Sequence, residues 1–396
     1  MGATINTGLH VLAYNKLKQM LGIDTGLSKI MSFEMNALFD LSIVEALEVD
    51  MVSIGLKINP APFYLPETEV RWKPVKLWGG EYLLPREWDI HRDADGTIWM
   101  DGFAWDPFNF NVPLDRPGCR LKCPGGGYYF DPVPLQGFPL LSNPTPTDYN
   151  PPFGYPDEWL RQIEESARWL YENTEYSLVC GEMINDFQLA PGGLDQWWMR
   201  MVSEPDAVHE FLDKAGEAAV SQLRVLEQAV GKYADMLMIA QDFGDLRGVQ
   251  IGPELWRDIY KPHYKELFTA WHHITDMKVS LHSCGSIVDI LGDLIECGLE
   301  VINPVQISAR GMEPRKLKAE FGDSIIFYGG SYDAVACPVE TPQLKVYEMV
   351  KENIETLSHG GGYIFSGVHN LQGNVPTEHL RAITDAFRDS RAGVAS

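Results

Sequence analysis

From about residue 155 onward, stretches with helical spacing alternate with short apolar runs, and this alternation limits the possible folds more than any other feature of the sequence. The apolar runs end in glycine or polar residues, as the buried strands of a parallel sheet do. The predicted strands lie at 177–181, 236–240, 279–282, 301–303, 325–330 and 362–366. The predicted helices lie at 158–174, 194–201, 205–230, 253–274, 286–297, 313–320 and 341–358. Such repetition indicates an α/β fold with a parallel sheet.

Two stretches of different character precede this repeat. Residues 1–57 combine helical spacing with an apolar strand at 50–56. Residues 58–155 are rich in proline, glycine and aromatic residues, and 93–96 separate two strand-like runs as a hairpin turn does. We expect a β-hairpin insertion here, which either packs on itself or forms a lid that walls a pocket. Its aromatic residues include Trp72, Trp78, Tyr82, Trp88, Trp99, Phe103, Trp105, Phe108 and Phe110.

The composition excludes several classes of partner. The chain has 55 acidic and 32 basic residues, for a net charge of −23, which would repel nucleic acid and anionic lipid. It has no apolar run of bilayer length and no recognisable secretory signal. Six cysteines in a chain of 396 residues indicate reduced thiols, so we expect a cytoplasmic protein that binds neither nucleic acid nor membranes.

Polar side chains gather directly after the predicted strands. In a (β/α)8 barrel the loops that follow the strands converge on one mouth, where the chemistry takes place. The residues in question are Glu182, Asp186, Asp242, His282, Cys284, Asn303, Gln306, Tyr332, Asp333, Cys337, His369 and Asn370. Two thiols, two histidines and several carboxylates in such positions indicate a functional site.

The segment His282-Ser283-Cys284-Gly285 ends one of these strands. Residues two apart in a strand point to the same side, so the imidazole and the thiol would project together as two metal ligands. The pattern alone is weak, because histidine and cysteine are also common in protein cores. Cys119, Cys123, Cys180 and Cys297 have no such partners and are predicted to be structural thiols.

Over residues 155–390 the sequence resembles the uroporphyrinogen decarboxylase superfamily, specifically its zinc- and corrinoid-dependent methyltransferases. The motifs that carry the resemblance are Gln241-Asp242-Phe243-Gly244, His282-Ser283-Cys284-Gly285, Gly329-Gly330-Ser331-Tyr332-Asp333 with Cys337, and Gly361-Gly362-Tyr363-Ile364 with His369-Asn370. The resemblance implies a single (β/α)8 (TIM) barrel over 1–396, with N-terminal additions and the site in 156–396. It also implies zinc bound by His282, Cys284 and Cys337.

Three ligands leave an open position, as in catalytic zinc sites. We expect Glu182 to fill it at rest, with Asp186 as the competing candidate. Asp242 and Glu182 are the predicted catalytic residues. The predicted substrate-binding residues are Asp186, Tyr332, Asp333, His369 and Asn370.

The resemblance leaves two methyl-transfer reactions open. In the first, a methyl group moves from an aromatic methyl ether to cob(I)alamin. In the second, methylcobalamin methylates a thiol such as coenzyme M. We favour the ether because the insertion is rich in aromatic residues, although relatives that demethylate methoxylated aromatics carry HSDG where this chain has His282-Ser283-Cys284-Gly285.

Other functions are less well supported by the sequence. Decarboxylation of a porphyrinogen would require arginines for its carboxylates, and the first arginine of this chain is Arg71. The chain has no D-x-H-x-x-G corrinoid motif, so cobalamin would arrive on a partner corrinoid protein. A tetrapyrrole-binding module and a structural protein are the non-enzymatic alternatives, and a homodimer is left open.

Overall fold

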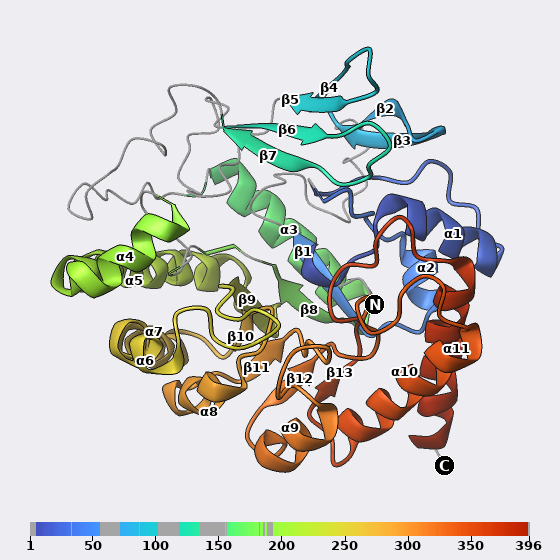
Figure 1. Cartoon of the computed structure of the whole chain (residues 1–396). Coiled ribbons are helices and arrows are strands. Elements are labelled where there is room, and N and C mark those ends of the chain that lie inside the picture. Colours follow the sequence, from blue (N-terminus) through green and yellow to red (C-terminus); the bar gives the residue numbers. More distant parts are fainter. Residues whose placement is uncertain are drawn as a thin grey trace.

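The computed structural model describes residues 5–32, 34–55, 72–86, 88–101, 119–134, 155, 157–181, 183–184, 187 and 193–394. Its centre is a curled parallel sheet (Figure 1). In spatial order, which follows the chain, the seven strands described are β1 (Met51–Gly55), β8 (Ser177–Cys180), β9 (Met236–Ala240), β10 (Lys278–His282), β11 (Val301–Asn303), β12 (Ile326–Tyr328) and β13 (Tyr363–Ile364). This arrangement resembles a TIM barrel, and it confirms the predicted α/β class.

Helices cover the outer side of the sheet. They are α3 (Asp157–Asn173), α4 (Leu194–Ser203), α5 (Pro205–Val230), α6 (Pro253–Ile259), α7 (Lys261–Ile274), α8 (Val288–Cys297), α9 (Pro314–Phe321), α10 (Gln343–Ser358) and α11 (Thr377–Val394). On β10, Val279 and Leu281 belong to the hydrophobic core shared with the helices. Ser280 and His282 alternate with them and are buried on the opposite side of the strand. The strand thus delivers His282 to the inside of the curled sheet.

The single helix predicted at 253–274 is in fact two helices, α6 and α7, with Tyr260 between them. Pro262 explains the break, because proline lacks the N–H of an interior helical position and its ring collides with the preceding turn. In the structure Pro262 lies in the first turn of α7, where proline is tolerated.

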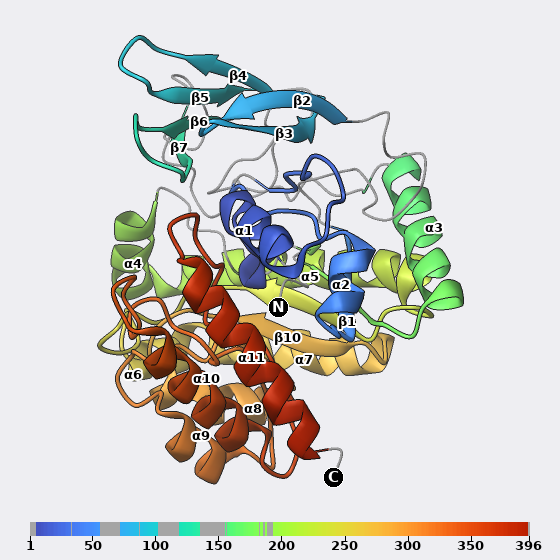
Figure 2. The ribbon, with the colours of Figure 1, turned by 90° about the vertical axis from the view of Figure 1, so that its right-hand side faces the viewer.

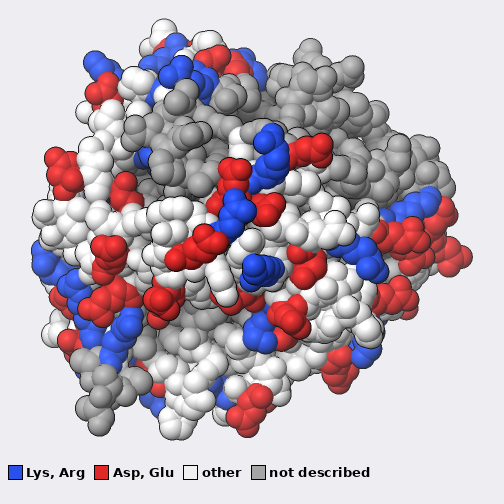
Figure 3. Space-filling model, turned by 180° about the vertical axis from the view of Figure 1, so that it is seen from behind, with Lys and Arg blue, Asp and Glu red and all other residues white. Residues whose placement is uncertain are grey.

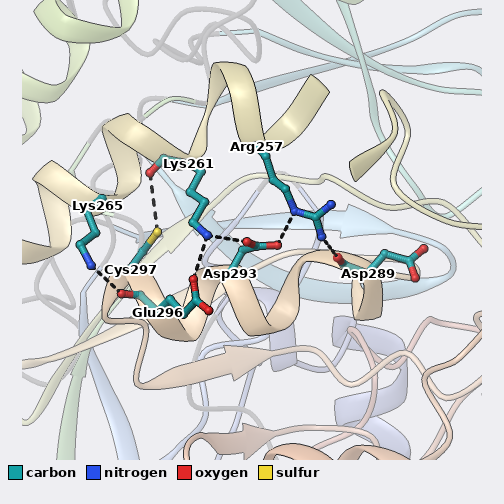
Figure 4. Close-up of polar contacts among 7 residues, drawn as sticks. All are labelled: Arg257, Lys261, Lys265, Asp289, Asp293, Glu296 and Cys297. Atoms are coloured by element: carbon teal, nitrogen blue, oxygen red, sulfur yellow. Dashed lines mark hydrogen bonds and ion pairs between the residues drawn. The ribbon is translucent and has the colours of Figure 1, made fainter. Parts of the chain in front are cut away.

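A row of charged contacts joins α6 and α7 to α8 (Figure 4). Asp293 accepts hydrogen bonds from Arg257 at 2.8 Å and from Lys261 at 2.5 Å. Lys261 also donates to Glu296, and these two bonds raise the pKa of Lys261 to about 12. Burial opposes ionisation of Asp293, but the hydrogen bonds from Lys261 and Arg257 outweigh it and lower the pKa of this carboxyl.

The N-terminal region and the insertion lie together over one side of the barrel (Figure 2). The N-terminal elements are η1 (Ile5–Thr7), α1 (Val11–Leu21) and α2 (Leu41–Ala46). The insertion contains a two-stranded antiparallel sheet of β2 (Trp72–Leu77) and β3 (Gly80–Pro85). A four-stranded antiparallel sheet follows, formed by β4 (Asp89–Arg92), β5 (Ile98–Asp101), β6 (Cys119–Cys123) and β7 (Asp131–Pro134).

The described aromatic residues of the insertion pack both within it and against the N-terminal region. Trp72, Tyr82 and Trp88 are buried, and Trp99 lies under the Arg120 guanidinium at 4.7 Å. Trp78 instead packs against His10 of the N-terminal region, with ring centroids 5.1 Å apart. Phe103, Trp105, Phe108 and Phe110 lie outside the described residues. The described part of the insertion therefore packs on the N-terminal region as well as on itself.

The surface carries both signs of charge. On the face shown in Figure 3, acidic side chains are interspersed with lysine and arginine, and no broad basic patch is seen. Among the described helices, none combines the length and the apolar composition needed to cross a membrane.

Candidate metal centre

Three potential metal ligands meet at the carboxyl-terminal end of the sheet. Within the part of the chain that the structure describes, His282, Cys284 and His369 form the one group of three or more such residues, with ligand atoms all within 4.8 Å of one another. His282 Nε2 lies 3.4 Å from Cys284 Sγ. The two imidazole rings are 5.5 Å apart and nearly perpendicular.

The fold explains how these residues meet. His282 is the last residue of β10, and Cys284 follows it by two positions. His369 lies in the loop after β13, which is separated from β10 in the sheet by β11 and β12. Because the sheet curls, the loops after β10 and β13 face each other across the mouth of the barrel.

Asn303 fixes the orientation of His282. The two residues are register partners on β10 and β11, and His282 Nδ1 lies 2.7 Å from Asn303 Oδ1. Asn303 Nδ2 donates to the carbonyl of Tyr328 at 3.0 Å, so its amide oxygen must face the histidine. Nδ1 therefore carries the hydrogen and donates it to Asn303. The lone pair of Nε2 is left to face Cys284 and His369, as in metal-bound histidines.

The loop that carries Cys284 is held by backbone contacts. Cys284 N donates to Asp242 Oδ1 at 2.8 Å, and Gly285 N donates to Gln306 Oε1 at 2.7 Å. Gly285 has a φ of +86°, and a Cβ added to it would lie 2.3 Å from the carbonyl carbon of Gly244. The backbones after β9 and β10 thus touch at Gly244 and Gly285. Only glycine allows so close an approach, because any other residue would bring a Cβ into the neighbouring backbone.

His369 is neutral at physiological pH. Burial, together with the neighbouring His282, lowers its pKa to about 4. A neutral imidazole has a lone pair to offer a cation, whereas an imidazolium has none. A hydrogen bond from Val368 N to Tyr332 O, at 2.7 Å, holds the loop that carries His369.

The donor group fits zinc. Zinc bonds of about 2.0 Å to nitrogen and about 2.3 Å to sulfur place tetrahedral ligand atoms roughly 3.6 Å apart. The 3.4 Å between His282 Nε2 and Cys284 Sγ is close to this separation. Two imidazoles and one thiol are also ligands that zinc commonly takes. Three protein ligands leave a fourth position for a substrate or water.

The structure does not bring Cys337 into this group, and His369 takes the place that was predicted for it. Cys337 is buried in the hydrophobic core, where its Sγ lies 3.5 Å from Met349 Sδ. The loop after β12 explains the difference, because a turn closed by Cys337 N and Asp333 O directs the thiol towards α10. Burial raises the pKa of this thiol, as expected for a core cysteine.

The other predicted residues have different surroundings. Asp242 borders the centre, with Oδ1 3.9 Å from His282 Nε2. Asp333 is buried and accepts hydrogen bonds from the backbones of Ser308 and Val335. These contacts favour loop support over substrate binding for Asp333. Glu182 and Asp186 lie outside the described residues.

Tyr332 and Asn370 are also engaged within the protein. Tyr332 is buried, and its hydroxyl lies 3.1 Å from His379 Nδ1. Asn370 Oδ1 accepts a hydrogen bond from Gly8 N, and its Nδ2 donates to Glu34. Both side chains therefore have partners within the protein, and their substrate-binding roles stay predictions.

Two contributors were not recognised from the sequence. Asn303 was noted as a strand-end residue, but its link to His282 follows only from the register of β10 and β11. The sequence predicts a substrate-binding role for His369. Its position shortly after the last predicted strand, next to the polar residue Asn370, could have indicated a metal ligand instead.

A cavity of about 760 Å³ lies elsewhere, with Met51 and Ser177 at the amino-terminal ends of β1 and β8 in its wall. Its wall also includes Tyr328 and Ile364, at the carboxyl-terminal ends of β12 and β13. None of His282, Cys284 and His369 lines it, so the cavity is separate from the candidate metal centre.

Comparison with known proteins gives a family match and a number of similar solved structures, two of which are described below. The model of the family described as Uroporphyrinogen decarboxylase (URO-D) matches residues 190–390, just over half of the chain. No curated protein matches the sequence. A solved structure of a methyltransferase from Methanosarcina mazei covers 98% of this chain and 93% of its own, with 15% identity and a TM-score of 0.53. At this identity the likeness concerns the fold alone.

A second solved structure, of a GH113 beta-1,4-mannanase, covers 59% of this chain and 79% of its own, with 11% identity and a TM-score of 0.30. A similarity this low supports no conclusion.

Proposed function

The chain belongs to the uroporphyrinogen decarboxylase (URO-D) family, and within that family we propose that it works as a zinc-dependent methyltransferase and not as a decarboxylase. It would move a methyl group from an aromatic methyl ether to the cob(I)alamin of a separate corrinoid protein. The observation that carries this proposal is the group of His282, Cys284 and His369 at the mouth of the barrel.

The surroundings of this group do not suit a substrate with many carboxylates. Among the described residues, Asp242 lies beside the group, with Oδ1 3.9 Å from His282 Nε2, and its carboxylate would repel a carboxylate of the substrate. The N-terminal 70 residues contain no arginine. Decarboxylation of a porphyrinogen would need cationic, preferably bidentate, contacts at this place.

The donor set also bears on the choice of methyl donor. When bound, zinc would supply a Lewis acid. With one thiolate and two neutral imidazoles as ligands, the zinc centre would keep a net charge of +1. This charge favours an ether oxygen over a sulfur as the fourth ligand. The site predicted from the sequence had two thiolates and no net charge. The replacement of Cys337 by His369 therefore supports the ether more firmly than the tryptophans of the insertion do.

The protein's own residues keep the site in order. Asn303 holds the His282 ring, and Asp242 holds the backbone of Cys284, so both ligands are fixed before a substrate arrives. In the proposed reaction the methyl group passes to the corrinoid acceptor, and the electron pair of the broken C–O bond stays on the phenolate oxygen. The acceptor must come from a partner over the mouth, because the chain has no corrinoid motif of its own.

X-ray absorption at the zinc edge, combined with a turnover assay, tests this proposal. We expect one sulfur among the zinc ligands of the purified protein. Mixing the protein with a methoxyarene and cob(I)alamin, free or on its carrier, should produce the absorption of methylcob(III)alamin. If coenzyme M or homocysteine adds a second sulfur while methoxyarenes give no product, the protein is a thiol methyltransferase and the ether proposal is wrong.

A further inference from the structure

Glu34 is a buried carboxylate at the junction of three distant segments. Its side chain is 8% exposed. Oε2 accepts hydrogen bonds from Asn370 Nδ2 at 2.5 Å and from Asn36 Nδ2 at 3.0 Å. Oε1 accepts a hydrogen bond from the Tyr129 hydroxyl at 3.3 Å. A buried carboxylate depends on such donors, because its desolvation is otherwise costly.

Asn370 links this carboxylate to the metal centre, because it is the residue directly after His369. Its Oδ1 accepts a hydrogen bond from Gly8 N at 2.8 Å. Next to it, Leu371 N donates to Gly8 O at 3.0 Å, and His10 N donates to Leu371 O at 2.8 Å. The loop that carries His369 is therefore pinned between the N-terminal segment and the backbone of Tyr332.

Tyr129 brings in the insertion. It lies in the segment between β6 and β7, and its hydroxyl donates a hydrogen bond to Glu34. Burial raises the pKa of Tyr129, and the charge of Glu34 raises it further, so the hydroxyl keeps its proton as a donor. The neighbouring contact from the same turn runs from the Tyr128 carbonyl to His10 Nε2 at 2.8 Å.

We propose that Tyr129, Glu34 and Asn370 form a positioning chain, here called the strut, through which the insertion fixes His369 at the metal centre. The inference rests on the metal site of the proposed function. In this arrangement the insertion contributes to metal affinity without supplying a ligand. Groups that orient metal ligands commonly change metal affinity by about 10- to 100-fold when they are removed.

Tyr129→Phe is the decisive variant, with Tyr128→Phe as its matched control. Both tyrosines are 37% exposed and adjacent, but only Tyr129 uses its hydroxyl on Glu34. Zinc affinity is measured by competition with a chromogenic chelator. We expect Tyr129→Phe to weaken zinc binding by about 3- to 10-fold and Asn370→Ala by about 10-fold or more, while Tyr128→Phe stays at the wild-type value.

The two single changes should also be coupled. Because Tyr129 and Asn370 act through the same carboxylate, the double variant should lose less zinc affinity than the product of the two single losses. Independent losses would contradict a continuous chain. Asn370→Ala alters a buried residue and can lower the folded fraction, so the half-exposed Tyr129→Phe remains the primary comparison.

Hydrogen exchange of the metal-free protein gives a second readout. The strut predicts faster exchange over residues 366–372 in Tyr129→Phe than in Tyr128→Phe. If both variants match in exchange and in zinc affinity while Cys284→Ser abolishes zinc binding, the strut is wrong and the proposed function stands. If Cys284→Ser keeps its zinc, the metal site fails, and the exchange comparison still decides whether the strut holds the loop.

Discussion

A single amide decides which nitrogen of His282 is free. Asn303 accepts from Nδ1, and it can do so only because its own Nδ2 is committed to the Tyr328 carbonyl. The Tyr328 carbonyl of β12 thus fixes the orientation of the Asn303 amide, and the amide fixes the tautomer of His282 on β10. Such outer contacts raise the basicity of the ligand and reduce the freedom of its ring.

Asn303→Leu should weaken zinc binding by about 10- to 100-fold, because the His282 ring loses the acceptor that fixes its tautomer. Chelator competition measures the change. Asn353→Leu is the control, since Asn353 is also buried but bonds the Ser331 carbonyl from α10. Equal zinc affinity in the two variants would rule out a role for the amide.

Cys337→Ala and His369→Ala should behave in opposite ways. The first removes a core thiol, so about one zinc per chain should remain, and unfolding should become easier by roughly 1 kcal/mol. The second removes a ligand, so bound zinc should fall sharply. Metal analysis of the purified variants measures both, and loss of zinc from Cys337→Ala would restore the original assignment.

The structure places Cys337 away from His282 and Cys284 for a physical reason. The spacing from the strand end to Cys337 is long enough for a turn, and the direction of that turn depends on hydrogen bonds that only the fold reveals. His282 and Cys284 were predictable because they sit on, or two residues beyond, a strand whose alternation fixes their side.

At the scale of elements, the loops after β9 and β10 meet at Gly244 and Gly285. Gly285 combines a φ of +86° with a neighbouring backbone where a Cβ would sit, so it has two separate reasons to be glycine. This contact sets the distance between Asp242 and Cys284. It thereby links the position of a metal ligand to the packing of two backbones.

Gly285→Ala should cost well over 2 kcal/mol of stability and weaken zinc binding, since strain and collision add. Gly252→Ala separates the two effects. Gly252 has a similar φ of +80°, but nothing lies within 4 Å of an added Cβ, so only about 1 kcal/mol is expected. Chemical denaturation compares them, and similar costs would show that the close approach is unimportant.

The contacts between α6, α7 and α8 make a second prediction. Asp293→Asn should destabilise the protein by roughly 1–2 kcal/mol, because Arg257 and Lys261 lose a partner that is 13% exposed. Since the fold lowers the pKa of Asp293, its contribution exists above the unfolded value of about 3.9 and disappears as the pH falls further.

Glu352→Gln provides the comparison for this pair, because Glu352 and Arg315 are 60% and 76% exposed. Its effect should stay within about 0.5 kcal/mol. Thermal unfolding at pH 7 and pH 3 measures both variants. If Asp293→Asn is as stable as the wild type at pH 7, the contacts of Asp293 do not stabilise the packing of α6 and α7 against α8.

The order of the elements could be predicted to a large extent. Apolar periodicity located the helices and strands from residue 157 to residue 364, because each must bury one side. Helix α11 (Thr377–Val394) was not predicted. The break at Pro262 was missed, since apolar spacing continues across it. The links between Glu34, Tyr129 and Asn370 could not be predicted, because no local pattern relates residues so far apart in the chain.

At the scale of the whole molecule, His10 is buried where the insertion packs against the N-terminal segment. It is 1% exposed, it packs on Trp78, and its Nε2 lies 2.8 Å from the Tyr128 carbonyl. Burial lowers its pKa to about 4, and nearby Lys16 adds to the effect. The fold therefore accepts only the neutral ring.

The protein should lose stability as the pH falls from 6.5 to about 4, because the unfolded chain binds a proton at His10 that the folded chain refuses. The expected contribution is up to about 3 kcal/mol. His10→Asn keeps a side-chain acceptor for Leu12 N at the start of α1 but cannot titrate. Its unfolding temperature should fall less steeply with acid than that of the wild type, and parallel profiles would exclude His10.

The pairing of Leu9 with Leu371 has a consequence for how the protein is made. Closing the loop between these two residues costs about 5 kcal/mol of chain entropy. The packing that forms together with the contact must offset this cost. On the ribosome the segment around Leu9 emerges before Leu371, which lies 362 residues further along the chain. The segment must therefore stay unpaired while the strands between the two residues are made, and the His369 loop can be locked only after those strands have formed.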